Sequence, residues 1–371
     1  MKSRRTALWL ALALTAIALA LMVAVPIIRS RQALATRAPA PAAAGPWYEL
    51  YFTSPHYPDR AEHRKGGVDE KLVALIDATQ KTLDMAIYDF DLQNVARAMA
   101  RAHARGVTVR MVTDTDTLTQ KDAAVQAALT TVKEAGIPVV DDQRRAIMHH
   151  KFVVSDSVAV LTGSWNFTTG DTYRLNNSVA IMRSTELAAN YANEFEKMFT
   201  RRQFGPTKAK DKPHPIVTLA GARVETYFAS QEDPTLRIAG AIREAKSKVD
   251  FLAFSFTHDA IGTALVERQA GGVKVRGVFE TTGAGTRFSE YTRLKDAGAE
   301  VYKDGNPYVM HHKVIVVDDH LVFFGSFNFS NNAAEDNDEN LLVVDDPVVA
   351  SAFSAEVNRM IALAQSPIRA R

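Results

Sequence analysis

One group of polar residues occurs twice in this chain of 371 residues, in the same order and with the same spacing. Each copy holds a histidine, a lysine two positions later, and then a serine and an asparagine that are two positions apart. Matched residues lie 162 positions apart; the pairs are His149 and His311, Lys151 and Lys313, Ser164 and Ser326, and Asn166 and Asn328. Imidazole, ammonium, hydroxyl and amide groups together suit a phosphate. The repetition therefore indicates a phosphate site supplied by two similar halves of the chain.

These residue types match what the cleavage of a phosphodiester requires. The reaction needs a nucleophile, an acid for the departing alkoxide, and fixed donors around the charged oxygens. Because histidine titrates near neutrality, one histidine can act while neutral and its twin while protonated. We expect the lysines and asparagines to hold the phosphoryl oxygens, with the serines in the same cradle. This scheme needs no cofactor and no divalent metal.

The adjacent histidines also allow a different interpretation, a metal site. In a strand, adjacent residues face opposite sides, so only one of His149 and His150, and one of His311 and His312, enters a shared site. We therefore predict no metal and expect His150 and His312 to support the packing. The Gly-Ser dipeptides would be read as turns if they stood alone. Their fixed spacing to the histidines in both copies favours a place in the site.

Composition limits the class of protein. The absence of cysteine excludes disulfides, thiolate nucleophiles and cysteine-zinc sites. An apolar content of 47% is enough for two ordinary domains, each with its own core. The formal charge of +2 is concentrated, because five basic residues and no acid lie in the first 35 positions. The rest of the chain is slightly acidic, which does not indicate a globally basic nucleic-acid binder.

An uncharged apolar segment, residues 7–28, lies near the N-terminus between arginines. As a helix its 22 residues would span roughly 33 Å, enough for the hydrocarbon core of a bilayer. We predict a single N-terminal membrane anchor with the globular part outside the cytoplasm. The alternative is a signal peptide cleaved near residues 33–35, which would give a secreted protein. Residues 38–46 are rich in alanine and proline and are predicted to form a short spacer.

Strand and helix patterns alternate in both halves of the chain, which is typical of an α/β fold. In the first half we expect strands at 47–52, 83–88 and 106–112, and helices at 68–81 and 95–104. The second half repeats this with strands at 224–228, 249–254 and 272–278, and helices at 235–247 and 261–270. The predicted organisation is a segment 1–46, a first lobe 47–205, a proline-containing linker 206–217 and a second lobe 218–371. Each histidine block leads into a pair of hairpin strands.

The pattern His-x-Lys, an aspartate five residues after the lysine, and then Gly-Ser-x-Asn resembles the phospholipase D superfamily. The residues that carry the resemblance are His149, Lys151, Asp156, Gly163, Ser164 and Asn166, and again His311, Lys313, Asp318, Gly325, Ser326 and Asn328. The resemblance covers residues 47–362 and is closer to compact nuclease-like and lipid-hydrolase-like members than to large phospholipases. It implies two lobes, each a mixed β-sheet flanked by helices, that face each other across a pseudo-twofold axis. It also implies that Asp156 and Asp318 support the structure.

The two copies differ at one informative position. Asn177 follows His149 by 28 residues, whereas Glu339 follows His311 by the same distance. In the family this residue commonly orients the histidine of the opposite lobe, so Glu339 would hold His149 and Asn177 would hold His311. A carboxylate stabilises the positive charge that develops on a phosphorylated imidazole. On this basis His149 is the predicted nucleophile and His311 the predicted acid and base.

The resemblance implies a phosphodiesterase that hydrolyses a phospholipid to phosphatidic acid and an alcohol through a covalent phosphohistidine. The expected partner is a phospholipid or a membrane surface, and no obligate protein partner is evident. Two alternatives stay open. One is an endonuclease acting on DNA or RNA, with nucleic acid as the partner, and the other is a phosphatidyltransferase that resembles cardiolipin synthase.

Overall fold

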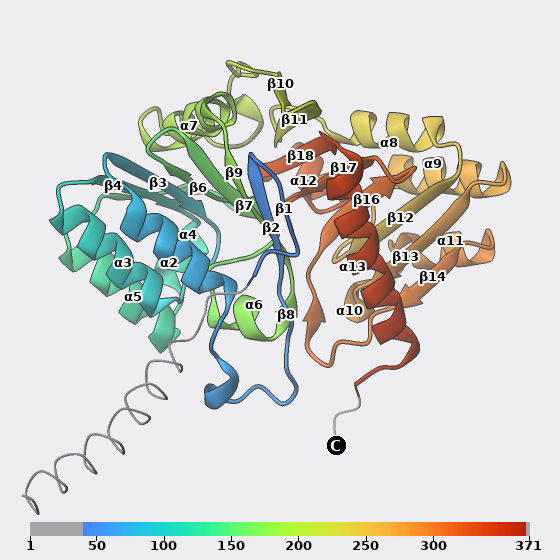
Figure 1. Ribbon diagram of the computed structural model, residues 1–371, viewed down its shortest axis with the longest axis horizontal. Helices are drawn as coiled ribbons and strands as arrows, with labels where there is room; N and C mark the ends of the chain where they lie inside the picture. The colour runs from blue at the N-terminus through green and yellow to red at the C-terminus, as the bar shows by residue number, and fades with distance from the viewer. Residues whose placement is uncertain (1–39, 369–371) are drawn as a thin grey trace, which may run out of the picture. The chain divides into compact units, whose positions relative to one another are not determined.

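The computed structural model describes residues 40–368, which belong to one compact unit (Figure 1). The predicted membrane segment, residues 7–28, lies outside the described residues. Between residues 40 and 368 there is no helix both long and apolar enough to cross a bilayer. Part of the predicted spacer is a strand, because β1 (Ala43–Ala44) pairs antiparallel with β2 (Tyr48–Phe52). The first sheet therefore begins before the predicted lobe boundary.

The first lobe is an eight-stranded mixed sheet with helices on both faces. Its strand order is β1, β2, β9 (Ser178–Arg183), β7 (Ala159–Gly163), β6 (Lys151–Ser155), β3 (Thr82–Ile87), β4 (Thr108–Thr113) and β5 (Val139–Asp141). The last three strands are parallel neighbours, and the other pairs are antiparallel. Its helical segments are η1 (Ala61–His63), α2 (Val68–Ala78), α3 (Gln93–Ala104), α4 (Thr115–Thr119), α5 (Ala123–Glu134), α6 (Thr169–Tyr173) and α7 (Thr185–Phe199).

The second lobe repeats this arrangement strand for strand. The order is β10 (Ile216–Leu219), β11 (Ala222–Ala229), β18 (Glu339–Asp345), β17 (Leu321–Gly325), β16 (Lys313–Val317), β12 (Lys248–Ala253), β13 (Lys274–Phe279) and β14 (Glu300–Lys303). Its helices are α8 (Thr235–Glu244), α9 (Asp259–Ala270), α10 (Thr281–Ala284), α11 (Glu290–Asp296), α12 (Asn331–Glu335) and α13 (Pro347–Gln365). The predicted fold class, two similar α/β lobes with mixed sheets, is confirmed.

Each sheet is buried on both faces, as strand β6 illustrates. Phe152 and Val154 point into a central core, whereas Val153 joins an outer core formed with α2, α3 and α5. Such alternation is the period-two geometry of a strand. Figure 1 shows α2, α3 and α5 on the outer side of the first lobe and α8, α9 and α11 on the outer side of the second.

The central core contains apolar side chains from both lobes and from α7 and α13. Phe52 of β2 and Phe353 of α13, for example, have ring centroids 5.3 Å apart. The two lobes therefore share one core, which is why the described residues form a single compact unit despite the duplication.

The predicted linker, residues 206–217, is anchored by a buried lysine. The 3₁₀ turn η2 (Gly205–Thr207) opens it, and its last two residues belong to β10. Between them the ammonium of Lys208 is fully buried and pairs with Glu194 of α7 and with Asp338, just before β18. Asp338 also pairs with Arg144. This segment is thus a structural clasp, since its lysine joins carboxylates from both lobes.

Replacing Lys208 with methionine should lower the free energy of unfolding by about 3–5 kcal/mol, because two buried carboxylates lose their cation. Denaturant unfolding followed by circular dichroism measures the change. Lys210→Met is the matched control, since Lys210 is exposed in the same segment. Equal stability of the two variants would contradict the clasp.

Candidate functional site

Backbone pairing between the lobes places the two histidines. β15 (Val309–Met310) pairs in parallel with β8 (Leu175–Asn176) of the other lobe. The N–H of His311 then donates to the carbonyl of Asn176, and the N–H of His149 donates to the carbonyl of Asp338, both at 2.9 Å. The next residue after each carbonyl is the one expected to hold the histidine. Each lobe therefore completes the site of the other.

The first histidine is held by a carboxylate. Nδ1 of His149 lies 2.8 Å from both oxygens of Glu339. Ser326 fixes this carboxylate by donating its hydroxyl to Oε2 at 2.6 Å. The contact expected between Glu339 and His149 is thus present, and it leaves Nε2 as the ring nitrogen available for chemistry.

The second histidine is held by an amide and also faces a carboxylate. Nδ1 of His311 donates to Oδ1 of Asn177 at 2.9 Å, as expected, and Ser164 donates to the same oxygen at 2.8 Å. Oδ1 of Asp171 lies 3.3 Å from the same Nδ1. The premise that His311 has only a neutral amide beside it is therefore wrong. The two histidines still differ. The contact from Nδ1 to a carboxylate is shorter at His149 than at His311, and it involves both carboxylate oxygens.

The two serines lie behind the residues that hold the histidines. Ser164 and Ser326 are completely buried and donate their hydroxyls to Asn177 and Glu339. Gly163 permits this arrangement, because a Cβ at that position would lie 2.0 Å from the carbonyl oxygen of Ser178. The serines therefore position the residues around the cleft, and the phosphate contact expected of them stays a prediction.

The two lysines fold back onto the histidine strands. Nζ of Lys151 donates to the carbonyl of His149 at 2.7 Å, and Nζ of Lys313 donates to the carbonyl of His311 at 2.9 Å. Each ammonium also lies over an aromatic ring, Tyr88 at 5.0 Å in the first lobe and Phe254 at 4.5 Å in the second, measured to the ring centroids.

The aromatic rings also pack against the histidines. Tyr88 meets His149 and Phe254 meets His311 edge to face, with centroids 5.0 Å and 4.7 Å apart. Packing of this kind restricts rotation of the imidazole rings. The histidine rings are thus fixed both by hydrogen bonds at Nδ1 and by contacts with these aromatic side chains.

Burial controls the protonation of the site. It lowers the pKa of His149 well below its usual value, and the nearby Lys151 and Lys313 lower it further. Burial likewise raises the pKa of Glu339 to about 7, although the lysines and Ser326 oppose the shift. It also lowers the pKa of Lys151 to about 8. At neutral pH the imidazole of His149 is therefore neutral, as a nucleophile requires.

The two asparagines offer polar atoms to a ligand. Oδ1 of Asn166 and Oδ1 of Asn328 are both buried and have no hydrogen-bond partner among residues 40–368. Buried polar atoms without partners are uncommon in folded proteins. A side-chain amide presents either its oxygen or its NH₂ group after a half-turn, so both residues suit a ligand that carries oxygens. Their phosphate-binding role stays a prediction.

The neighbouring histidines serve the interior instead. His150 and His312 have no exposed surface, whereas the side chains of His149 and His311 each keep 7%. Nε2 of His150 contacts Glu194 at 3.3 Å, and Nε2 of His312 contacts Glu356 at 2.9 Å. The adjacent histidines therefore face different surroundings, as expected, although they lie just before β6 and β16 and not within a strand.

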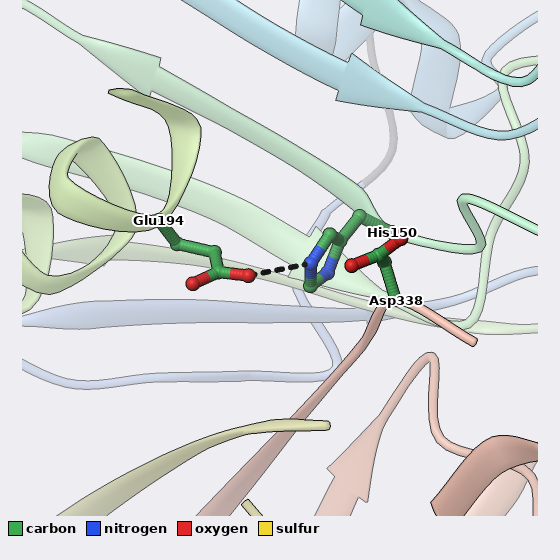
Figure 2. A group of neighbouring side chains, drawn as sticks. All are labelled: His150, Glu194 and Asp338. Atoms are coloured by element: carbon green, nitrogen blue, oxygen red, sulfur yellow. Dashed lines mark hydrogen bonds and ion pairs between the residues drawn. The ribbon is translucent and has the colours of Figure 1, made fainter. Parts of the chain in front are cut away.

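One group around His150 has the composition of a metal site. Figure 2 shows His150, Glu194 and Asp338 around one point, with their ligand atoms within 4.8 Å of one another. However, the ammonium of Lys208 pairs with both carboxylates. A divalent ion would have to displace this buried lysine. The group therefore fits a salt-bridge network better than a metal centre.

Asp156 and Asp318 support the hairpins, as the resemblance implies. The carboxylate of Asp156 accepts the backbone N–H groups of residues 80–82, and that of Asp318 accepts those of residues 246–248. Both residues have a left-handed backbone, with φ near 50°. They lie at the far end of β6 and β16 from the histidines and fix the start of the strand that pairs with each of these two strands.

The two ends of the pseudo-symmetric site are not alike. A cavity of about 460 Å³ lies beside the segment that leads to His149, lined by Arg145, Ala146, Ile147, Asn332, Asp336 and Asn337. In the 162-residue register, the equivalent positions in the other half include Tyr308 and Arg174. An insertion present only in the first lobe, residues 54–67, contacts both of these. The carboxylate of Asp59 accepts a hydrogen bond from Arg174 at 2.6 Å, and the backbone N–H of Asp59 donates to the hydroxyl of Tyr308 at 2.7 Å. The insertion therefore covers one end and leaves the other open.

Comparison with known proteins places the fold and the repeat in a family. A family model described as "Cardiolipin synthase, PLD-like domain" matches residues 72–199 and again 238–361. The chain belongs to the phospholipase D superfamily. Each matched stretch lies within one lobe and contains one histidine block.

Several relatives are similar over about the length of one lobe. Mitochondrial cardiolipin hydrolase of Xenopus tropicalis is 34% identical over 129 residues, which cover 35% of this chain and 60% of that protein. Phospholipase D of Rickettsia conorii is 30% identical over 43% of this chain and 80% of its own. The chain thus spans less than two thirds of the first of these relatives.

A solved structure resembles both lobes together. The phosphatidylserine synthase of Haemophilus influenzae has a TM-score of 0.62 over 91% of this chain and 90% of its own, at 14% sequence identity. This likeness supports the two-lobed fold of the superfamily.

Sequence reasoning missed Asp171, Tyr88 and Phe254. Asp171 had a detectable signal, because the 162-residue register places it opposite Ala333, so a charge occurs in only one copy. Tyr88 and Phe254 follow strands β3 and β12, but their proximity to the histidines depends on the pairing of those strands with β6 and β16.

The carboxyl of Glu339 should titrate near pH 7, because burial disfavours its charge. Carbon-detected NMR of the side-chain carboxyls measures this. The signal with a midpoint near 7 should vanish in Glu339→Gln and persist in Glu335→Gln, an exposed control four residues away. A midpoint near the ordinary value of 4.5 would contradict the burial argument.

Proposed function

We propose that this chain is a phosphodiesterase of the phospholipase D type, in which His149 forms a covalent phosphohistidine. The observation that supports this most is the shared setting of the two histidines. Each has its Nδ1 engaged by the opposite lobe. The same two lysines, Lys151 and Lys313, influence the protonation of both rings. Two imidazoles with free Nε2 atoms and a common pair of cations suit one phosphoryl group.

In the first step, Nε2 of His149 attacks phosphorus while the bond from phosphorus to the leaving oxygen breaks. Binding of the anionic diester favours the protonated form of His311, and the proton on its Nε2 passes to the leaving oxygen, so the alcohol leaves neutral. His149 becomes positively charged as the P–N bond forms. Glu339 balances this charge, because Nδ1–H of His149 points at its carboxylate. Both contacts of that carboxylate, at 2.8 Å, favour His149 over His311 as the nucleophile.

In the second step, the now neutral His311 takes a proton from water. The resulting hydroxide attacks phosphorus, and the P–N bond breaks to restore His149. Lysine ammonium groups and asparagine amides hold the phosphoryl oxygens during both steps. These residues and one water molecule account for every proton transferred and every bond made or broken in this scheme, which includes no metal.

For the substrate we propose a phospholipid, cleaved to phosphatidic acid and an alcohol. Two observations support this choice: the predicted membrane segment at residues 7–28 and the names of the relatives, which are a cardiolipin hydrolase and a phospholipase D. A nucleic acid presents the same phosphodiester, and an alcohol in place of water would give transfer instead of hydrolysis. Parallel assays with labelled phosphatidylcholine, cardiolipin and a single-stranded oligonucleotide, with and without glycerol as acceptor, separate these outcomes.

His149→Ala should reduce turnover by about 10³-fold or more and abolish the covalent adduct, because the nucleophile is lost. His311→Ala should slow turnover by about 10²–10⁴-fold while still allowing the adduct to form from a p-nitrophenyl diester, whose leaving group needs no acid. Rapid quenching and mass spectrometry of peptides detect the adduct.

The matched control is His320→Ala, since His320 is exposed in the second lobe. An adduct on His311 of the unmodified protein would reverse the assignment of the two histidines. Failure to cleave lipid, oligonucleotide and p-nitrophenyl diester would overturn the phosphodiesterase itself.

We also propose that the N-terminal segment anchors the protein in a membrane, with the globular part outside the cytoplasm. The full chain should then sediment with membranes after a carbonate wash, whereas a chain that begins at residue 39 should not, because it lacks the apolar segment. Protease added to intact cells tests the orientation. Release of the protein into the medium as a shortened chain would favour the secreted alternative.

A further inference from the structure

The two lobes carry their acidic residue at different positions. In the 162-residue register, Asp171 corresponds to Ala333, and Asn177 corresponds to Glu339. Each lobe thus has one carboxylate and one uncharged residue at this pair of positions, in opposite order. Both positions face the histidine of the opposite lobe when they are occupied by an acid.

The carboxylate of Asp171 is fixed by several donors. Oδ1 accepts from the backbone N–H of Asn166 at 3.1 Å, and from the side-chain amides of Asn166 and Asn177 at 3.3 Å. Oδ2 accepts the hydroxyl of Thr168 at 3.0 Å. The carboxylate is buried and stays in place beside His311, because its hydrogen bonds leave it little freedom to turn.

We propose that Asp171 is the positioning residue that supplies His311 with negative charge, in place of the glutamate that the second lobe uses. This proposal rests on the proposed function, in which His311 must carry a proton to the leaving alcohol. Asn177 fixes the direction of the ring through Nδ1, but an amide adds no charge. Asp171 provides the charge from the short helix α6, so the task that Glu339 performs alone is divided between two residues.

The charges around His311 show why a carboxylate matters there. Burial and the ammonium groups of Lys313 on β16 and Lys151 on β6 lower the pKa of His311, and Asp171 on α6 opposes them. The pKa that results from all of these is about 3. Burial alone would raise the pKa of Asp171, but its hydrogen bonds with His311 and Asn166 lower it. Asp171 is therefore anionic at neutral pH and favours the protonated form of His311.

Ala333 explains why the acid can occupy either of the two positions. Its side chain lies at the same point of the second lobe and shows that this turn folds without an acid. Ser164 already donates to position 177 as Ser326 does to position 339, so a glutamate at 177 would meet the same hydroxyl. The pattern of the second lobe can therefore be transplanted into the first.

Asp171→Asn tests the charge with little change in shape. We expect kcat/KM for a diester with an alkyl leaving group to fall by about 10² relative to that for a p-nitrophenyl diester, because only the former needs an acid. The basic limb of the pH profile for the alkyl diester should also move to lower pH. A residue that merely supports the fold would lower both rates by one factor and leave the profile unshifted.

Asp171→Ala with Asn177→Glu restores one carboxylate in the arrangement of the second lobe. This double variant should cleave the alkyl diester at least about tenfold faster than Asp171→Ala alone. Equal loss on both diesters by Asp171→Asn, with no rescue by the double variant, would overturn the inference while leaving the phosphodiesterase intact. Inactivity of the unmodified protein on both diesters would overturn the proposed function and this inference with it.

Discussion

The reciprocal pairing of the two lobes is the constraint on which the site depends. The backbone N–H of each histidine donates to a carbonyl of the other lobe, that of Asp338 for His149 and that of Asn176 for His311. The residue that follows each carbonyl then meets Nδ1 of the histidine. Because the backbone sets this register, a separation of the lobes would remove the partner of both rings at once. The shared apolar core and the Lys208 clasp oppose such a separation.

Burial gives the site its reactivity at a cost in stability. Two lysines, two histidines and two carboxylates lie almost out of solvent, where an unpaired charge is unfavourable. Their mutual contacts offset part of this cost, but the raised pKa of Glu339 and the lowered pKa of Lys151 show that the compensation is incomplete. The same imbalance keeps His149 neutral and therefore nucleophilic. Ligand oxygens between the lysines would supply the missing negative charge.

The duplication made much of this structure predictable. Two α/β lobes follow from a repeated alternation of strand and helix, and the separate duties of His149 and His150 follow from the period of a strand. The resemblance to the family, carried onto this register, also identified Glu339 as the partner of His149. The repeat relates equivalent positions of the two lobes only. It does not show which non-equivalent residues lie close together in space. Asp171 lies in the short helix α6 and has no charged counterpart in the other lobe, and its approach to His311 depends on how the lobes dock. Lys208 fell within the predicted proline-containing linker, because nothing local indicates that two carboxylates from distant segments surround it.

Divergence between the copies shows which features the site requires and which it permits to vary. The histidines, lysines and asparagines stay identical in both halves, as expected if both halves hold one phosphoryl group. The acid beside each histidine has changed position, from 339 in one lobe to 171 in the other, yet each imidazole still faces one carboxylate. What the two lobes share is therefore a carboxylate near Nδ1 of the histidine, and not an acid at one particular position. The insertion at residues 54–67 breaks the symmetry further by covering one end of the site. The pseudo-twofold axis therefore describes the scaffold, whereas the surroundings of the two histidines are chemically distinct, as the proposed mechanism requires with its nucleophile on one side and its acid on the other.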